Sequence, residues 1–345
     1  MQNKIKNIID SHLHQYIRYL DKTYSLKRVS PVLFKHIADF ILRDGKRVRP
    51  ILLVVGYLGF AKKVAANLYK TALSIELLHD FMLVHDDIID KSDIRRGKPS
   101  MHKMLENYLR KFKRLKFNGQ DLAIVSGDIM YAMAIDTFLS IKEKMQRKEK
   151  ALRRFIQAAV YTGMGEFIEL LGGIKDIAKT TKKDIFRIYD YKTAHYTFAC
   201  PLATGAILAG APEREVNKLY SYGISVGRAF QIKDDIIGMF NKEKEIGKSV
   251  LTDLQEAKKT LLVWHAYHHS DAAGKSAIQK VFTKDKVDKN DLLRMREVVI
   301  KSGSLDHAHK EIAALLDQAQ KTISSCAIRP YYKSYLYDYS QTLLN

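Results

Sequence analysis

Long segments with helical periodicity and few interruptions constrain the fold of this chain most strongly. Only six prolines, at positions 31, 50, 99, 201, 212 and 330, break its 345 residues. Between them, segments such as 68–90 repeat apolar residues every three or four positions, which is the spacing of one helical face. No segment alternates apolar and polar residues for long enough to predict a sheet. The sequence therefore predicts an all-α fold, a single large helical bundle, with one domain spanning residues 1–345.

The composition is that of a soluble globular protein. A hydrophobic fraction of 46% in a chain of 39.6 kDa is enough for a large buried core. The longest nearly apolar stretches, 51–61 and 199–211, are too short to span a bilayer, and the first residues lack a secretory pattern. Only Cys200 and Cys326 are present, and we expect both to be reduced, buried thiols. These features predict a cytoplasmic location.

The charge is strongly positive, with a formal net charge of +20. Such a field could serve nucleic acid, an anionic membrane or a phosphorylated substrate. The basic residues are spread along the chain without the signature of a nucleic-acid-binding module, so we expect no nucleic-acid partner. The segment 110–117 interleaves basic and aromatic residues as a membrane-surface helix does. A solvated loop or helix edge is the simpler interpretation, and peripheral membrane contact stays an alternative.

Two similar acidic motifs, VHDDIID and IKDDIIG, lie far apart in the chain. The first contains Asp86, Asp87 and Asp90, and the second contains Asp234 and Asp235. On a helix these carboxylates crowd together and repel one another unless cations lie between them. Because both motifs are embedded in apolar sequence, the carboxylates are expected to face a pocket rather than bulk water. Hard oxygen ligands suit Mg²⁺, which keeps positions for substrate phosphates, so the pair predicts the two sides of a site for Mg²⁺ and a diphosphate.

Basic residues flank the first acidic motif on both sides. The segment 45–50 reads GKRVRP, and the segment 95–98 reads RRGK. Arginine binds phosphate oxygens in bidentate fashion, whereas lysine contributes a point charge. Carboxylates bracketed by such cations are typical of a site for phosphate groups and their metals.

These motifs make the chain resemble the trans-isoprenyl diphosphate synthases of the short-chain polyprenyl synthase family. The matching pieces follow the family's order over roughly residues 40 to 265: GKRVRP at 45–50, ELLH at 76–79, DDIID at 86–90, RRG at 95–97, GD at 127–128, YKTA at 191–194, FQIKDD at 230–235, GK at 247–248 and DLQEAKKT at 253–260. The resemblance implies a helical bundle around a central catalytic cavity. It also implies head-to-tail condensation of isopentenyl diphosphate with an allylic diphosphate, with Mg²⁺ as cofactor, in a homodimer.

The resemblance carries residue roles with it. It implies that the metal ligands are Asp86, Asp90 and Asp234. It implies support through water or hydrogen bonds from Asp87 and Asp235. The allylic diphosphate would be held by Arg95, Lys192 and Lys248. Isopentenyl diphosphate would be held by Lys46, Arg49, His79 and Arg96, and a further substrate-binding residue would be Lys258. The candidates for stabilising the carbocation are Thr193 and Gln231. A structural core role for His79 and a helix-surface position for Lys192 are the alternatives.

Three departures from the family pattern accompany the resemblance. Gly238 stands in place of the last aspartate of the second motif, which should leave activity intact. Glu166 and Glu169 stand where the family usually has Gln and Asp, and they add negative charge near the expected allylic site. The segment 103–121 is longer than in many relatives, without an evident role in the mechanism.

The length of the product is predicted from the residues that precede the first motif. In the family, the residues four and five positions before the first aspartate form the floor of the elongation cavity, and here these are Met82 and Phe81. Helical geometry favours Met82, which lies closer to the face of Asp86. A single aromatic residue at this floor favours a C20 product, geranylgeranyl diphosphate, over C15.

Other functions remain alternatives: a C15 or longer product of the same reaction, a class I terpene cyclase, or a non-catalytic partner subunit that binds prenyl diphosphates. Cyclases usually replace the second Asp-rich motif, and such subunits tend to lose one motif. This chain keeps both.

Overall fold

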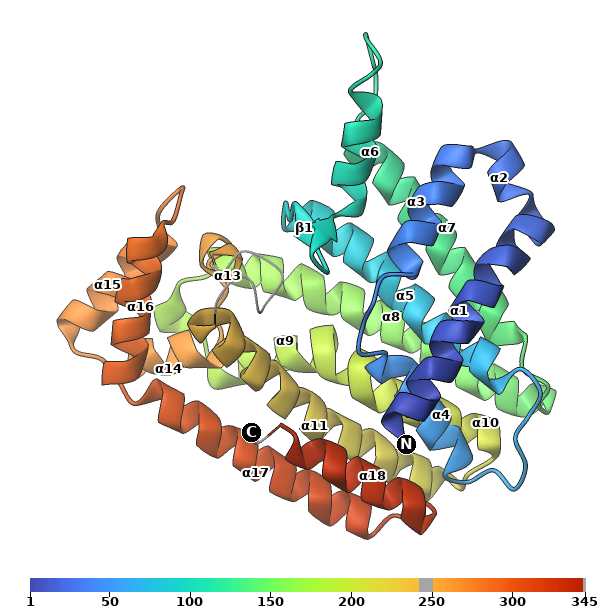
Figure 1. Ribbon diagram of the computed structural model, residues 1–345. Coiled ribbons are helices and arrows are strands. Elements are labelled where there is room, and N and C mark those ends of the chain that lie inside the picture. The colour runs from blue at the N-terminus through green and yellow to red at the C-terminus, as the bar shows by residue number, and fades with distance from the viewer. Residues whose placement is uncertain (242–250, 344–345) are drawn as a thin grey trace. The chain divides into compact units, whose positions relative to one another are not determined.

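The computed structural model describes residues 1–241 and 251–343. Their regular secondary structure is helical apart from two strands of two residues each, so the all-α prediction is confirmed (Figure 1). They divide into two compact units, Met1–Leu152 with Thr204–Gly210, and Arg153–Ala203 with Ala211–Asn345.

The first unit contains seven complete helices and one small hairpin among its described residues. In chain order these are α1 (Gln2–Tyr24), α2 (Leu26–Val29), α3 (Pro31–Ile41), α4 (Val48–Leu58), α5 (Leu68–Ile89), β1 (Ile94–Arg95), β2 (Lys98–Pro99), α6 (Met101–Leu109) and α7 (Gly119–Leu139). The unit boundary falls inside α8 (Met145–Ile174) and again inside α10 (Cys200–Ala209). The core of this unit consists of apolar residues such as Leu53, Ile75 and Phe138, none of which is exposed.

Helix α5 carries the first acidic motif and packs along α7 (Figure 1). The close approach depends on Gly127 of α7, because a Cβ atom there would lie 2.4 Å from the ring of His85 on α5. This close approach gives a physical reason for glycine at position 127 of the motif set. The beginning of α7 is set by Asn118, whose side chain accepts hydrogen bonds from the backbone of Gln120 and Asp121.

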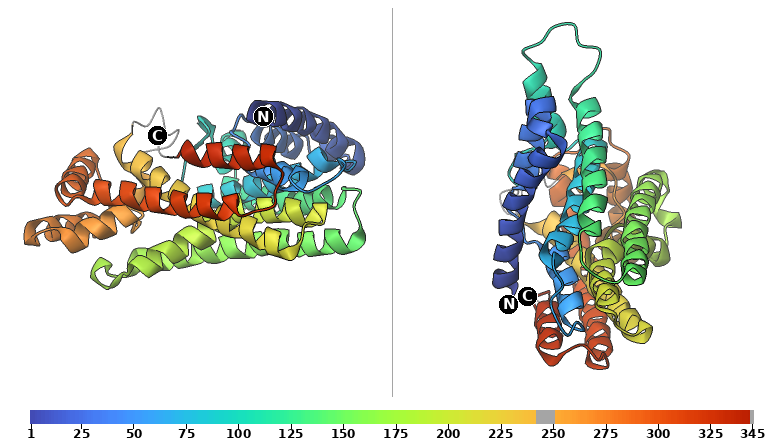
Figure 2. Two further views of the ribbon diagram at one scale, coloured as in Figure 1. Left: turned by 90° about the horizontal axis from the view of Figure 1, so that it is seen from below. Right: turned by 90° about the vertical axis from the view of Figure 1, so that its right-hand side faces the viewer.

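The second unit contains the remaining complete elements. They are η1 (Ile177–Lys179, a 3₁₀ turn), α9 (Lys182–Tyr189), η2 (Asp190–Ala199, a π-helix), α11 (Glu213–Phe240), α13 (Thr252–Gln255), α14 (Leu261–His269), α15 (Ala272–Phe282), α16 (Lys289–Lys301), α17 (Ser304–Ser324) and α18 (Pro330–Gln341). Helix α11, which carries the second acidic motif, packs against η2 and α17 (Figure 2). The tyrosine-rich segment near residue 335 forms α18, which begins at Pro330 in the first helical position, where the missing N–H of proline costs no hydrogen bond.

Two further predictions from composition can be compared with the structure. Cys200 and Cys326 are free and buried, which confirms the prediction for the thiols. Among the described residues, one helix, α7, is long and apolar enough to cross a bilayer; it packs against α5 and α6.

Candidate active site

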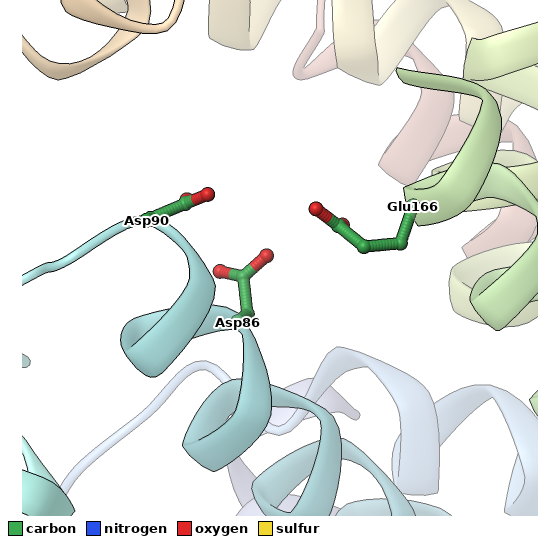
Figure 3. A group of neighbouring side chains, drawn as sticks. All are labelled: Asp86, Asp90 and Glu166. Carbon is green, nitrogen blue, oxygen red and sulfur yellow. The ribbon is translucent and has the colours of Figure 1, made fainter. Parts of the chain in front are cut away.

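The first acidic motif lies at the C-terminal end of α5. Asp86 is in the last helical turn and Asp90 is the residue directly after the helix, and both side chains project from the same side (Figure 3). Their carboxylate oxygens lie within 4.8 Å of one another, and both residues are partly exposed. Two hard oxygen donors this close together fit Mg²⁺. Figure 3 also draws Glu166, which belongs to α8 in the second unit.

The middle aspartate of the motif, Asp87, is fully buried and bound to an arginine. Its Oδ1 lies 2.7 Å from Nε and 2.5 Å from Nη2 of Arg95, and Nη2 of the same arginine lies 3.2 Å from Oδ2 of Asp86. Burial raises the pKa of Asp87 to about 6, against the opposing effect of Arg95. Arg95 is therefore held at the acidic motif by two carboxylates, of which Asp87 is the buried one.

A tight turn directs the two consecutive arginines to different partners. Strands β1 and β2 pair Ile94 with Pro99 and Arg95 with Lys98, and the two residues between them, Arg96 and Gly97, both have positive φ, 53° and 70°. Two left-handed residues in a two-residue hairpin loop are typical of a type I′ turn. Arg95 consequently contacts the C-terminal end of α5, at Asp87. Arg96 contacts Asp80, seven residues earlier on the same helix.

Arg96 joins a buried network of charges on α5. Its Nη2 lies 3.5 Å from Oε1 of Glu76, and its Nη1 lies 3.3 Å from Oδ1 of Asp80. Glu76 Oε1 also accepts a hydrogen bond of 2.7 Å from Nη1 of Arg47, whose Nε donates to Asp10 at 2.9 Å. The side chains of Glu76, Asp80 and Arg47 are at most 3% exposed. Sequence reasoning assigned no role to these three residues, although the cations of GKRVRP and the two carboxylates in and directly after ELLH were a signal for pairing.

His79 lies in a strongly cationic environment. Its burial, together with Arg49, Arg96, Arg95 and Arg47, lowers its pKa well below the ordinary value. The imidazole is therefore neutral near pH 7 and can act as a hydrogen-bond donor or acceptor without adding charge. Four guanidinium groups close enough to shift this pKa form the kind of field that binds a diphosphate. The structure thus brings together Arg49, His79 and Arg96, three of the four residues predicted to hold isopentenyl diphosphate; Lys46, the fourth, is exposed in the loop before α4.

Asp80 should make stability depend on pH. Its carboxylate is fully buried without a hydrogen-bond partner among the described residues, and burial raises its pKa from 3.8 to about 7. Between these values the folded chain keeps a proton that the unfolded chain releases, so the free energy of unfolding falls as pH rises. Urea titrations from pH 4 to 7 measure this free energy. The difference in free energy of unfolding between Asp80→Asn and the wild type should rise in favour of the variant by up to about 1.4 kcal/mol per pH unit.

The variant also loses the contact to Arg96, which shifts its free energy of unfolding by a nearly constant amount at every pH. The prediction therefore concerns how the difference in free energy changes with pH. Asp317→Asn, which removes an exposed carboxylate paired with Lys321, is the matched control and should run parallel to the wild type. Parallel curves for Asp80→Asn as well would contradict the shifted pKa.

The second acidic motif, on α11, repeats the division seen in the first. Asp234 is exposed, whereas Asp235 is only 8% exposed. Asp235 accepts hydrogen bonds from the hydroxyl of Tyr189 and, at 2.9 Å, from Nε2 of Gln231. In both motifs the first aspartate is the more exposed of the two, and the second is buried and bound by a neighbouring side chain, an arginine in one and a tyrosine in the other.

Thr193 extends this hydrogen-bonded chain into η2. Its hydroxyl donates to Oε1 of Gln231 at 2.6 Å, and Gln231 in turn donates to Asp235. Tyr189 accepts a hydrogen bond of 2.8 Å from the backbone N–H of Leu261. The two residues predicted to stabilise a carbocation are thus in direct contact, with the amide of Gln231 oriented from both sides.

Lys192 is also in η2 and is bound by the two glutamates that depart from the family pattern. Its Nζ lies 2.7 Å from Oε2 of Glu166 and pairs with Oε2 of Glu169 as well. The approach is close because residue 165 is glycine, where a Cβ would lie 2.5 Å from the backbone nitrogen of Lys192. The added negative charge therefore neutralises Lys192, a consequence that the sequence left undecided.

The other lysines predicted to bind substrate are less completely defined. Lys258 lies 2.7 Å from Oε2 of Glu256 and 4.0 Å from Oε2 of Glu169, so it belongs to the same group of charges. Lys248 lies outside the described residues. Gly238, on α11, is partly exposed and one turn beyond Asp234.

The two predicted chain-length residues lie on α5 and are partly exposed. The ring of Phe81 packs against the ring of Tyr131 on α7, with 5.1 Å between centroids, and against His85 at 4.7 Å. Phe81 is therefore part of an aromatic layer between α5 and α7, a packing that helical geometry alone did not anticipate.

The chain is similar in sequence to known proteins. The sequence profile described as Polyprenyl synthetase matches residues 31–299. The geranylgeranyl diphosphate synthase of Saccharolobus solfataricus is 30% identical, over 89% of this chain and 85% of the relative. The geranylfarnesyl diphosphate synthase of Aeropyrum pernix is 32% identical, over 82% of this chain and 84% of the relative.

Solved structures share the fold. The crystal structure of geranylgeranyl pyrophosphate synthase from Corynebacterium glutamicum, complexed with isoprenyl diphosphate and magnesium, superposes with a TM-score of 0.91 at 23% identity, covering 100% of this chain and 99% of that one. The geranylgeranyl pyrophosphate synthetase from Pyrococcus horikoshii gives a TM-score of 0.82 at 26% identity, covering 100% and 96%. The chain therefore belongs to the polyprenyl synthetase family and is a polyprenyl diphosphate synthase, a prenyltransferase, as the resemblance of its motifs predicted.

Proposed function

We propose that this enzyme condenses isopentenyl diphosphate with an allylic diphosphate, head to tail and with Mg²⁺, to give mainly the C20 product geranylgeranyl diphosphate. The observation that carries this proposal is the end of α5, where the carboxylates of Asp86 and Asp90 lie within 4.8 Å of each other and Arg95 is held beside them. This arrangement offers metal ligands and a phosphate-binding cation at one place.

The proposed Mg²⁺ ligands are Asp86, Asp90 and Asp234. Bound Mg²⁺ supplies Lewis-acid stabilisation of the negative charge that develops on the departing diphosphate. Arg95, kept in position by Asp87, would add a fixed positive charge to the same leaving group. Lys192, Lys248 and Lys258 are the further proposed contacts to phosphate.

Breaking the allylic C–O bond leaves a diphosphate and an allylic carbocation. The double bond of isopentenyl diphosphate then donates its electron pair to form the new C–C bond, and the departing diphosphate can accept the proton that is finally lost. The hydrogen-bonded pair of Thr193 and Gln231 presents oriented dipoles, proposed to stabilise the cation. Arg49, His79 and Arg96, with Lys46, are the proposed holders of isopentenyl diphosphate.

One assay separates this function from its alternatives. The purified protein is incubated with Mg²⁺, isopentenyl diphosphate and geranyl diphosphate, and the dephosphorylated products are identified by chromatography. Linear prenols of the C20 length are expected. Cyclic hydrocarbons formed from the allylic substrate alone would indicate a terpene cyclase, and no product at all would indicate a partner subunit.

Phe81 should limit the length of the product. The relatives are named after both geranylgeranyl and geranylfarnesyl products, so a small change in cavity depth is expected to shift the product. Phe81→Ala removes a ring that packs on Tyr131 and should move the main product beyond C20. Phe112→Ala, at an exposed ring, is the control and should keep the wild-type pattern. Mainly C30 or longer chains from the wild type would refute the C20 proposal.

A homodimer is part of the proposal and has support in an apolar stripe on α8. Large exposed side chains recur there every three or four positions: Ile156, Val160, Met164, Phe167 and Leu171. Phe167 is 64% exposed and Val160 53%. An apolar helix face of this kind is typical of a protein interface.

Light scattering should give the mass of a dimer for the wild type. Val160→Asp combined with Phe167→Asp should give a monomer, because burying two carboxylates in an apolar interface is unfavourable. Lys310→Asp, an exposed substitution on α17, should remain dimeric. A wild-type protein with the mass of a monomer would overturn this part of the proposal.

The proposal also covers the domain organisation and the location of the enzyme. We infer that residues 1–345 form a single polyprenyl synthase domain. A cytoplasmic location is supported by the two free, buried thiols, which suit a reducing compartment.

A further inference from the structure

The loop between α6 and α7, residues 110–118, is an exposed projection with fixed ends. Helix α6 ends at Leu109, and Asn118 caps α7 through reciprocal hydrogen bonds with Asp121. The chain reverses near Arg114, which has a positive φ of 58°. The loop extends beyond the helices of the first unit in two views (Figure 1, Figure 2). Every residue from 110 to 118 is exposed, so the sequence run is a solvated loop and not a membrane-surface helix.

The loop carries five cations: Arg110, Lys111, Lys113, Arg114 and Lys116. No acidic residue occurs between positions 107 and 120. Within residues 1–241 and 251–343, no carboxylate forms an ion pair with any of the five. A cluster of cations without anionic neighbours creates a local positive field directed at solvent.

Three apolar side chains alternate with these cations and face water. Phe112 is 46% exposed, Leu115 40% and Phe117 47%. Nζ of Lys111 lies 4.1 Å from the ring centroid of Tyr108 and 5.3 Å from that of Phe112. Cationic and aromatic groups are therefore direct neighbours on this surface. All three apolar side chains thus remain exposed in the folded chain.

We propose that the α6–α7 loop docks the enzyme on an anionic lipid surface. The five cations match the charge of acidic headgroups, and the apolar side chains can enter the boundary between headgroups and acyl chains. Nucleic acid would use the cations and could stack on the two phenylalanines, but the exposed Leu115 gains nothing from that contact. A lipid surface accommodates all eight side chains.

Sedimentation with vesicles tests the charge requirement. The full-length wild type should pellet with vesicles of phosphatidylcholine and phosphatidylserine, much less with phosphatidylcholine alone, and less as salt rises. Replacing Lys113, Arg114 and Lys116 by Gln should weaken binding to the acidic vesicles about a hundredfold, since each cation near such a surface contributes about fivefold. Turnover in solution should not change, because the loop has no part in the proposed chemistry.

The matched control removes three exposed lysines elsewhere. Lys286→Gln, Lys289→Gln and Lys310→Gln change the net charge equally and should keep binding within about twofold, because these residues lie outside the loop. An equal loss in this control would show that net charge alone drives binding and would overturn the assignment to the loop. Absence of wild-type binding to acidic vesicles would do the same, as would tighter binding to duplex RNA or DNA than to the vesicles.

A fluorescence measurement tests insertion directly. The chain has one tryptophan, Trp264, whose indole N–H donates to the backbone carbonyl of Thr180, so a second one can be followed by difference. Leu115→Trp should show a blue-shifted difference spectrum when acidic vesicles are added and no shift with neutral vesicles. A difference spectrum that stays at the position of exposed tryptophan with acidic vesicles would overturn insertion.

Discussion

Asp86→Ala should lower kcat about a thousandfold or more while leaving the helical fold intact. The carboxylate of Asp86 is a proposed Mg²⁺ ligand and also lies 3.2 Å from Nη2 of Arg95. Its loss removes one ligand and loosens one cation at the leaving group, and charge stabilisation by a bound metal is worth several kcal/mol. A loss of about 4 kcal/mol corresponds to three orders of magnitude in rate.

The measurement has three parts: kcat with saturating substrates, the Mg²⁺ concentration for half-maximal activity, and far-ultraviolet circular dichroism. Asp317→Ala, which removes an exposed carboxylate on α17, is the control and should keep kcat within about twofold of the wild type. Retained turnover in Asp86→Ala would remove this residue from the metal site. An unfolded variant would show a structural role, in which case Asp86→Asn, with nearly the same shape, separates the two.

Arg47→Ala should lower the stability of the fold, whereas Lys46→Ala should weaken substrate binding, although the two residues are neighbours in the sequence. Arg47 is 2% exposed at its side chain and binds Glu76 and Asp10. Its removal leaves Glu76 buried with only the more distant Arg96, and breaking such a buried pair costs about 3 to 5 kcal/mol. Urea denaturation should show this loss in the free energy of unfolding.

Lys46 is exposed, and its removal should leave the unfolding transition unchanged. Because Lys46 is a proposed contact to isopentenyl diphosphate, Lys46→Ala should instead raise the KM for that substrate about tenfold, since a hydrogen bond to a charged group is worth about 1.5 kcal/mol or more. A stability loss in Lys46→Ala equal to that of Arg47→Ala would contradict the division of roles within the GKRVRP motif.

The parts of the site that are close in sequence could be predicted. Asp86 and Asp90 are four residues apart, and the geometry of one helix places their side chains on the same side. The all-α fold followed from periodicity and from the few prolines, two of which, Pro31 and Pro330, stand at the first position of a helix. The family followed from nine short motifs in order, and the match over residues 31–299 bears it out.

The partners of the charged residues could not be predicted in this way. Lys192 pairs with Glu166 and Glu169, which lie on another helix, so their charge alone did not reveal whether they would oppose metal binding or neutralise a lysine. Asp235 binds the hydroxyl of Tyr189, 46 residues away. The ring of Phe81 contacts His85 on its own helix and Tyr131 on α7, and the second contact could not be predicted from the sequence of α5 alone.

The sequence by itself determined the helical architecture and the family, because these depend on local periodicity and on short contiguous motifs. Only the tertiary structure decided which charges are buried, since burial depends on which helix packs against which. It separated Arg47 from Lys46, sent Arg95 and Arg96 to different carboxylates through one tight turn, and left the cations of the α6–α7 loop facing solvent. Physically, a side chain's position along its own helix follows from the sequence of that helix, whereas its partner is supplied by another part of the chain.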